Sequence, residues 1–198
     1  MTYTFGDIIQ ALEVMYGIPD SRRSTFAARL KHFQKLGFPR GTNTGRGHAA
    51  VYSAEHAFLL AFVLELNQLG HTPERSIALA GKVLFGVIDA IPHILQKFAN
   101  PDRIFYIRIQ SRMLTYALTG SKRLPIGMFS VNNGESFPDS FLQDPSVAFM
   151  NVNIIIEKLI TCMATFSPKF SDELIAWANA NHSRTTEYYD FDSSHGDS

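Results

Sequence analysis

Histidine, cysteine and paired acid–base residues are the side chains of this sequence that could carry out catalysis or bind a metal. The seven histidines show no HExxH or similar metal-binding spacing, and no Gly-x-Ser-x-Gly nucleophile motif occurs. They are His32, His48, His56, His71, His93, His182 and His195. The single cysteine, Cys162, excludes an intramolecular disulfide, and its apolar neighbours favour a packed side chain over a reactive thiol. His93 follows Pro92 in an apolar stretch and is interpreted as a packed histidine. We therefore expect no enzyme activity, no metal and no cofactor.

Positive charge that could bind an anionic partner is concentrated in one segment, Ser21–Ala54. This segment contains no Asp or Glu and carries a charge of +7, whereas the rest of the chain carries −7 and the whole chain is neutral. A basic segment can be an ordinary solvated face, but seven charges in an acid-free window favour contact with phosphates. The sequence therefore predicts a nucleic-acid partner.

The elements that would position these charges are predicted from apolar periodicity. The spacing predicts a helix at Phe5–Tyr16, a turn at Gly17–Asp20 and a second helix at Ser24–Leu36 that ends at Gly37. The second helix has an apolar stripe that is expected in the core, and it consists of Phe26, Leu30, Phe33 and Leu36. The glycine-rich stretch that follows predicts a hairpin with a short β segment at Ala49–Tyr52. Two helices, a turn and a hairpin predict a winged helix-turn-helix, in which one helix enters the major groove of DNA.

The remaining sequence predicts two further helices and a small α+β region. Ser53 caps a third helix at Ala54–Leu69, and Thr72 caps a fourth that begins at Pro73 and runs towards Phe98, with Pro92 expected to kink it. After the boundary at 100–102, strands are predicted at 103–115 and 123–131, and a short helix at 170–182. Residues 146–166 predict either a strand running into a helix or one buried helix. The expected fold class is mainly α with minor β.

The stretch YSAEHAFLLAFVLELNQLGHTPERSIAL, Tyr52–Leu79, resembles the wing exit and third helix of the MerR-like winged helix-turn-helix transcription regulators. Upstream, KHFQKLGFP is similar to the end of that family's recognition helix, with Lys31 where an arginine reaches phosphate and Phe33 where a tyrosine sits. The resemblance covers about residues 5–82. It departs from the family in a longer turn after the first helix, and in Ala50 and Val51, where the wing has an arginine before its tyrosine.

The basic segment and the resemblance together predict the residues that contact DNA. The second helix is expected to read the major groove, while Arg40 and Arg46 are expected to hold phosphates or the minor groove beside the glycines. The predicted set is Arg22, Arg23, Thr25, Arg29, Lys31, His32, Lys35, Arg40, Thr42, Asn43, Arg46 and His48.

Four regions are predicted: a winged helix-turn-helix at 1–82, a linking helix at 83–100, a C-terminal dimerisation or effector domain at 101–182, and a disordered acidic tail at 183–198. Phe58, Leu59 and Leu64 are apolar where the family is polar, so the C-terminal domain or a second subunit is expected to cover them. A stripe on the fourth helix is also expected to need a partner, and it consists of Leu79, Val83, Val87, Ile91 and Leu95. These features predict a homodimer formed by Ile77–Phe98 and the domain after Asn100.

The expected function is that of a transcription regulator that binds a palindromic operator on double-stranded DNA as a dimer, with RNA polymerase or another protein as a further partner. The N-terminal residues lack the pattern of a signal peptide, and the longest apolar stretches, such as Ala57–Leu64, are judged too short to cross a membrane. A cytoplasmic, nucleoid-associated protein is therefore expected. Two alternatives remain open: a DNA-architectural or recombination accessory protein, and a protein-interaction module.

Overall fold

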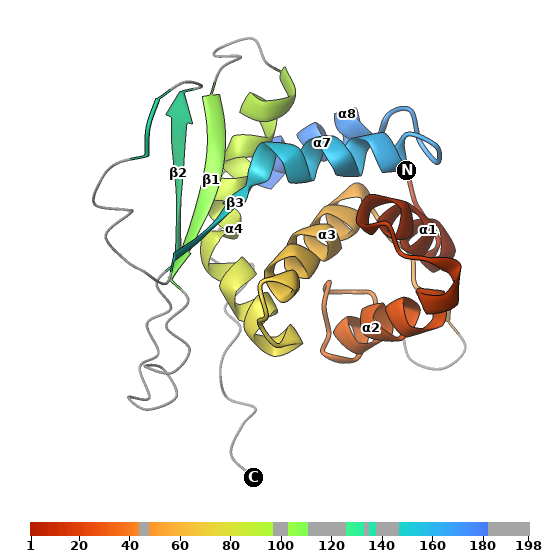
Figure 1. Cartoon of the computed structure of the whole chain (residues 1–198). Helices are drawn as coiled ribbons and strands as arrows, with labels where there is room; N and C mark the ends of the chain where they lie inside the picture. The colour runs from red at the N-terminus through yellow and green to blue at the C-terminus, as the bar shows by residue number, and fades with distance from the viewer. Residues whose placement is uncertain (44–47, 97–102, 111–125, 133–134, 138–146, 182–198) are drawn as a thin grey trace. The chain divides into compact units, whose positions relative to one another are not determined.

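The structure is a computed structural model of the whole chain, and it describes residues 1–43, 48–96, 103–110, 126–132, 135–137 and 147–181 (Figure 1). Over these residues the chain is mainly helical with one small antiparallel sheet, as the sequence predicts. It divides into two compact units. Unit 1 comprises Met1–Ile77 and Ile154–Trp177, and unit 2 comprises Ala78–Asn153 and Ala178–Ser198. The predicted boundaries at residues 82 and 100 separate regions by their expected function, whereas the two units are separated by their contacts. These functional boundaries therefore stay predictions.

Unit 1 begins with two helices joined by a short turn, α1 (Phe5–Tyr16) and α2 (Arg23–Lys35), with a 3₁₀ turn η1 (Asp20–Arg22) between them (Figure 1). Thr4 and Asp7 form a capping box at the start of α1, in which each side chain accepts the backbone N–H of the other residue. The helix ends at Gly17, whose φ of 60° lies in the left-handed region that favours glycine. The predicted turn at Gly17 is therefore confirmed.

The predicted apolar face of α2 is confirmed for three of its four residues. Phe26, Leu30 and Phe33 are buried, whereas Leu36, expected on the same stripe, is only half-buried because it lies beyond the last helical residue. Gly37, with a φ of 76°, follows it and turns the chain away from the helix.

Helix α3 (Ala54–Gln68) is buried on nearly all sides, as expected of a helix that is apolar all round. Phe58, Leu59 and Leu64 are 0%, 0% and 4% exposed, so the predicted cover exists within this chain. The Phe58 ring stacks on Phe62 at 5.9 Å and meets the Trp177 indole at 6.0 Å. Trp177 belongs to α8 (Phe170–Asn181), so a C-terminal helix supplies part of that cover.

The C-terminal helices complete the core of unit 1. The alternative of a strand running into a helix is confirmed at 146–166, as β3 (Val147–Asn151) followed by α7 (Val152–Met163). The Tyr3 ring packs edge-on against Phe170 at 6.0 Å, and its hydroxyl donates to Glu173 Oε2 at 2.9 Å. The N-terminal residues are thereby fastened to α8.

Unit 2 holds a three-stranded antiparallel sheet in the order β2-β1-β3, with β1 at Arg103–Gln110 and β2 at Ile126–Asn132. The predicted alternation of β1 is confirmed, because Phe105, Ile107 and Ile109 are buried while Tyr106 and Arg108 are half-buried on the opposite face. That second face carries an aromatic cluster formed by Tyr106, Phe129, Phe137 and Phe149, with ring centroids 4.7–6.0 Å apart.

Helix α4 (Pro73–Gln96) packs against the buried face of this sheet in unit 2. A side chain added at Gly86 would lie 2.9 Å from Met128 Cε of β2, and the His93 ring stacks on Phe105 at 6.3 Å. His93 was interpreted as a packed histidine. One face of its ring does pack on Phe105, but the side chain as a whole is exposed. Pro92 lies inside the helix and does not end it.

The apolar stripe of α4 does not need a second subunit. Leu79, Val83, Val87 and Ile91 are 1%, 5%, 0% and 0% exposed within the single chain, and Leu95 is half-buried. The expectation that this stripe needs a second subunit is therefore wrong, because other parts of the same chain cover it, while the homodimer itself stays a prediction.

One helical stretch of the described residues, Pro73–Leu95, is long and apolar enough to cross a bilayer, with a mean hydropathy of 1.6. The judgement that every apolar stretch is too short for this was therefore wrong. The most apolar part of the stretch is 56% buried inside the structure, which is consistent with a core helix of a soluble protein.

The predicted hairpin after α2 is not confirmed. In residues 37–43 and 48–53, the described part of this segment, the one β pairing is an isolated antiparallel bridge between Tyr3 and Tyr52, with N···O distances of 2.8 and 2.9 Å. Arg46 and two of the glycines expected in the hairpin lie outside the described residues, as does the predicted acidic tail.

Candidate nucleic-acid interface

The outward face of α2 is small and polar near its start and positively charged near its end. Ser24, Thr25 and Ala28 are exposed in the first half, and Lys31 and Lys35 are exposed four residues apart in the second. Residues three or four apart share one face of a helix. The helix contains no acidic residue. The outward face of α2 therefore presents small side chains in its first half and positive charge in its second half.

Three of the other predicted contacts are engaged inside unit 1. Arg23 Nε lies 3.1 Å from Glu13 Oε2 and 3.3 Å from Asp20 Oδ1, and His32 Nε2 lies 3.5 Å from Glu74 Oε1. Arg29 Nη1 donates to Asn67 Oδ1 of α3 at 2.5 Å. These side chains fasten α2 to α1, α3 and the start of α4, so part of the basic charge is already neutralised.

The remaining cations of α2 have no such partner. Among the residues that the structure describes, no carboxylate lies within ion-pair distance of Arg22, Lys31 or Lys35. Lys31 and Lys35 thus present unneutralised charge on the outward face, and Arg22 presents it at the start of the helix.

A hollow of about 350 Å³ lies between the second half of α2 and the segment that follows it. We call it the basic hollow, and it is lined by Phe5, Lys31, Gln34, Lys35, Thr42, Asn43, His48 and Ala50. It brings together five of the predicted contact residues from two elements, and no acidic side chain lines it. Two ammonium groups beside amide and imidazole groups form a setting that suits a phosphate group.

The shape of the basic hollow depends on Thr42 and Tyr52. The hydroxyl of Thr42 donates to the Pro39 carbonyl at 2.8 Å, and the residue is only 2% exposed. Gln34 Nε2 donates to the Tyr52 hydroxyl and lies 3.5 Å from the Thr42 carbonyl. Burial raises the pKa of Tyr52 to about 12, so its hydroxyl stays neutral. Thr42 therefore serves to hold the turn rather than to present its side chain to a partner.

A capping box at the start of α3 pairs the predicted cap, Ser53, with His56. The Ser53 N–H donates to His56 Nδ1 at 3.2 Å, and the His56 N–H donates to Ser53 Oγ at 3.4 Å. Burial lowers the pKa of His56, which favours the neutral ring that this acceptor role requires. Ser53 was predicted as the cap, but its reciprocal partner is usually Glu or Gln, so histidine at the third position was overlooked.

The other predicted residues lie elsewhere. Arg22, Thr25 and Arg29 line a different hollow on another flank of α2, Arg40 is exposed, and Arg46 lies outside the described residues.

The residues considered for catalysis form no cluster among those that the structure describes. In the described part of the chain, no group of three or more His, Cys, Asp or Glu residues is placed to hold a metal ion. Cys162 is half-buried, and burial raises the pKa of its thiol while Lys158 acts in the opposite direction.

No protein-family model matches this chain, and no curated protein or solved structure is significantly similar to it. The resemblance of residues 5–82 to MerR-like regulators therefore rests on the quoted residues alone and stays a prediction.

Proposed function

We propose that this protein binds double-stranded DNA, with α2 in the major groove and the basic hollow against the backbone of the duplex. The observation that carries the proposal is the outward face of α2, which has small side chains at its start, Lys31 and Lys35 at its end, and no acidic residue.

The dimensions of α2 suit this role. Its 13 residues correspond to about 20 Å of helix, and a helix with its side chains is about as wide as the major groove, roughly 12 Å. In helix-turn-helix proteins the N-terminal residues of the recognition helix contact base edges. Ser24, Thr25 and Ala28 are small enough to let the helix approach closely, and the two hydroxyls can donate to or accept from bases.

The basic hollow would then hold the DNA backbone. Contacts to phosphate position a protein on the duplex without reading its sequence. Lys31 and Lys35 would neutralise phosphates while Asn43 and His48 add hydrogen bonds from the opposite wall, and Arg40 lies on the same segment. Arg29, by contrast, is assigned to the flank of α2, where Asn67 holds its guanidinium.

The finer proposal is a sequence-specific transcription regulator of the MerR-like winged helix type. One recognition helix reads only a few base pairs, so a two-fold dimer on a palindromic operator would supply the remaining specificity. Because the α4 stripe is buried in the single chain, another surface would have to form that dimer. RNA polymerase or another protein would be a further partner of such a regulator, and association with the nucleoid would follow from DNA binding.

Replacing Lys31 and Lys35 together by Ala tests the proposal. Each lost phosphate contact should reduce the slope of log affinity against log salt concentration by about 0.9, so the double variant should lose about 1.8 in slope and bind duplex DNA more weakly at every sequence. Fluorescence anisotropy with a labelled duplex, titrated at several salt concentrations, measures both quantities.

Lys82→Ala with Lys169→Ala is the matched control, because it removes the same charge from two other exposed lysines. Equal affinity and slope for the Lys31/Lys35 variant and the control would refute the assignment of α2. A footprint separates the remaining alternatives: one palindrome supports a regulator, several clustered sites with bending support an architectural protein, and the absence of any footprint supports a protein-interaction module.

A further inference from the structure

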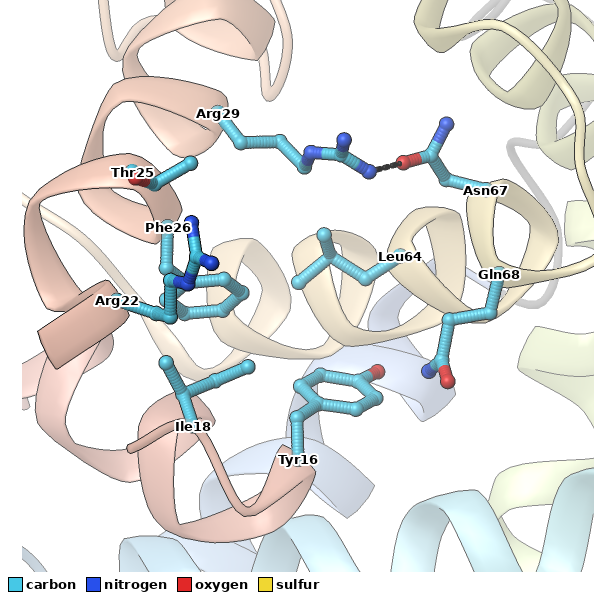
Figure 2. A pocket seen from close by; sticks show the side chains of 9 residues that line it. All are labelled: Tyr16, Ile18, Arg22, Thr25, Phe26, Arg29, Leu64, Asn67 and Gln68. Carbon is cyan, nitrogen blue, oxygen red and sulfur yellow. Dashed lines mark hydrogen bonds between the residues drawn. The ribbon is translucent and has the colours of Figure 1, made fainter. Parts of the chain in front are cut away.

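A second hollow, of about 280 Å³, lies in unit 1 between the end of α1, the start of α2 and the end of α3 (Figure 2). We call it the arginine pocket. Its apolar part is formed by Tyr16, Ile18, Phe26 and Leu64, whose side chains lie below Arg29 in Figure 2. The Tyr16 hydroxyl donates to the Ala61 carbonyl at 2.8 Å, and burial raises the pKa of Tyr16, so the ring lines the pocket while its hydroxyl is neutral and already satisfied.

The polar part of the arginine pocket contains cations and uncharged groups but no acid. It consists of Arg22, Thr25, Arg29, Asn67 and Gln68. The Arg29 guanidinium is held across the pocket by its hydrogen bond to Asn67 Oδ1 (Figure 2). Asn67 Nδ2 donates in turn to the His71 carbonyl at 2.5 Å. A side chain with a fixed donor group loses less conformational freedom when it binds an anion.

The charge of the two arginines is not compensated within the described part of the chain, where no carboxylate lies within ion-pair distance of Arg22 or Arg29. A guanidinium presents a planar fork of donors that matches the two oxygens of a carboxylate. The neighbouring apolar wall would favour a ligand whose carboxylate is attached to an apolar body.

We propose that the arginine pocket binds a small organic monocarboxylate with an aromatic or branched apolar body. Its volume lies just below the usual range for ligand pockets, about 300–1,000 Å³, which suits a ligand with one ring rather than a nucleotide. The carboxylate lies against Arg29 and Arg22, and the apolar body lies against Phe26 and Leu64.

A consequence follows that rests on the proposed DNA binding. Arg22 and Thr25 lie on or directly before the exposed start of α2, so a ligand in the arginine pocket occupies groups beside the surface assigned to DNA. Ligand and DNA therefore compete, and the carboxylate acts as an effector that releases the protein from its operator.

Calorimetric titration of the full chain without DNA tests the pocket directly. The probe is 3-phenylpropionate, and the matched probes are 3-phenylpropan-1-ol, which lacks the charge, and acetate, which lacks the ring. We expect one 3-phenylpropionate per chain and binding of the other two at least about tenfold weaker. Arg29→Ala should weaken 3-phenylpropionate binding about tenfold to a hundredfold, since it removes a charge-assisted hydrogen bond.

Two further variants keep the test specific. Lys82→Ala removes an equal charge from an exposed position outside the pocket and should leave binding unchanged. Gln68→Trp, at an exposed position on the pocket rim, should fill the space and abolish binding while the circular dichroism spectrum stays that of the wild type. Absence of saturable binding to the wild type at millimolar concentration would overturn the proposal. So would equal binding of the alcohol, or full binding by a folded Gln68→Trp variant.

Competition between ligand and DNA is measured in a separate experiment, as displacement of a labelled duplex by 3-phenylpropionate. If the probe binds the protein and no duplex does, the proposed function fails and the ligand pocket stands. If both bind but neither affects the other, competition is refuted.

Discussion

At the scale of single residues, the basic side chains of α2 divide into those that fasten the helix and those that face solvent. Arg23 and His32 pair with Glu13 and Glu74, which come from other elements, whereas Lys31 and Lys35 have no carboxylate within ion-pair distance in the described residues. All four side chains lie in the same acid-free segment of the sequence, so the sequence does not tell them apart. The distinction depends on contacts between residues that are distant along the chain, and it directs mutagenesis to the two lysines.

His56 should make the stability of this protein depend on pH. Its lowered pKa means that the folded state binds a proton less readily than the unfolded state, in which the pKa is about 6.5. The contribution to stability is therefore fully present above the unfolded pKa and is lost as the pH falls from there through the folded value. Protonation also removes the acceptor for the Ser53 N–H, and a hydrogen bond of this kind contributes about 1 kcal/mol to stability. Burial lowers the pKa of His71 too, so both act in the same direction.

The variant His56→Gln isolates this effect, because glutamine at the third position preserves a capping box without titrating near neutral pH. We expect its free energy of unfolding, measured by urea denaturation between pH 7.5 and 5.5, to fall less than that of the wild type. His48→Gln, a change at an exposed position that caps no helix, is the control. A pH dependence in His56→Gln equal to that of the wild type would show that the cap does not titrate in this range.

At the scale of elements, α3 is the centre of unit 1. It is buried along most of its length, and groups from several other helices meet it, including the Tyr16 hydroxyl of α1, Arg29 of α2 and Trp177 of α8. The proposed recognition helix is therefore positioned by a helix that itself depends on the C-terminal part of the chain.

Phe58→Ala should destabilise the protein by about 3–5 kcal/mol, the usual cost of deleting a fully buried aromatic side chain. Because Trp177 is the one tryptophan and lies 6.0 Å from the Phe58 ring, its fluorescence should shift to longer wavelength in the folded variant. Urea denaturation followed by fluorescence measures both effects. Phe85→Ala, at a position 48% exposed, is the control and should cost much less. A Phe58→Ala variant as stable as this control, with unchanged emission, would contradict the packing of α8 on α3.

At the scale of the whole molecule, unit 1 is discontinuous in sequence. Its N-terminal helices are completed by Ile154–Trp177, which follow the sheet of unit 2 along the chain. Folding of the DNA-binding surface should therefore require the C-terminal region, although the sequence resemblance ends near residue 82.

A fragment of residues 1–100 should consequently fail to fold. Without α7 and α8 it would expose Phe58 and leave the Tyr3 hydroxyl without Glu173, so its thermal denaturation, followed by circular dichroism at 222 nm, should show no cooperative transition. A fragment of residues 1–181 keeps all of unit 1 and should melt as the full chain does. A cooperative transition in the 1–100 fragment, together with DNA binding, would mean that the N-terminal region is an independent domain.

The local features of this protein follow from its sequence because they depend on neighbours along the chain. The bounds of α1, the glycine at its end, the caps at Ser53 and Thr72 and the alternation of β1 were all predicted, since periodicity and capping need only a few consecutive residues. The charge asymmetry of residues 21–54 is likewise a property of the sequence, and the structure leaves Lys31 and Lys35 of that segment exposed.

Only the tertiary structure decided which apolar surfaces are covered and which charges are paired. The stripe on α4 and the apolar face of α3 look alike in sequence to surfaces that need a second subunit, but both are buried within one chain. The neutralisation of Arg23 by Glu13, the inward position of Thr42 and the gathering of Arg22 and Arg29 over an apolar wall also depend on how helices pack. Periodicity tells which face of a helix is apolar, whereas the identity of the surface that covers it depends on contacts between residues far apart in the chain.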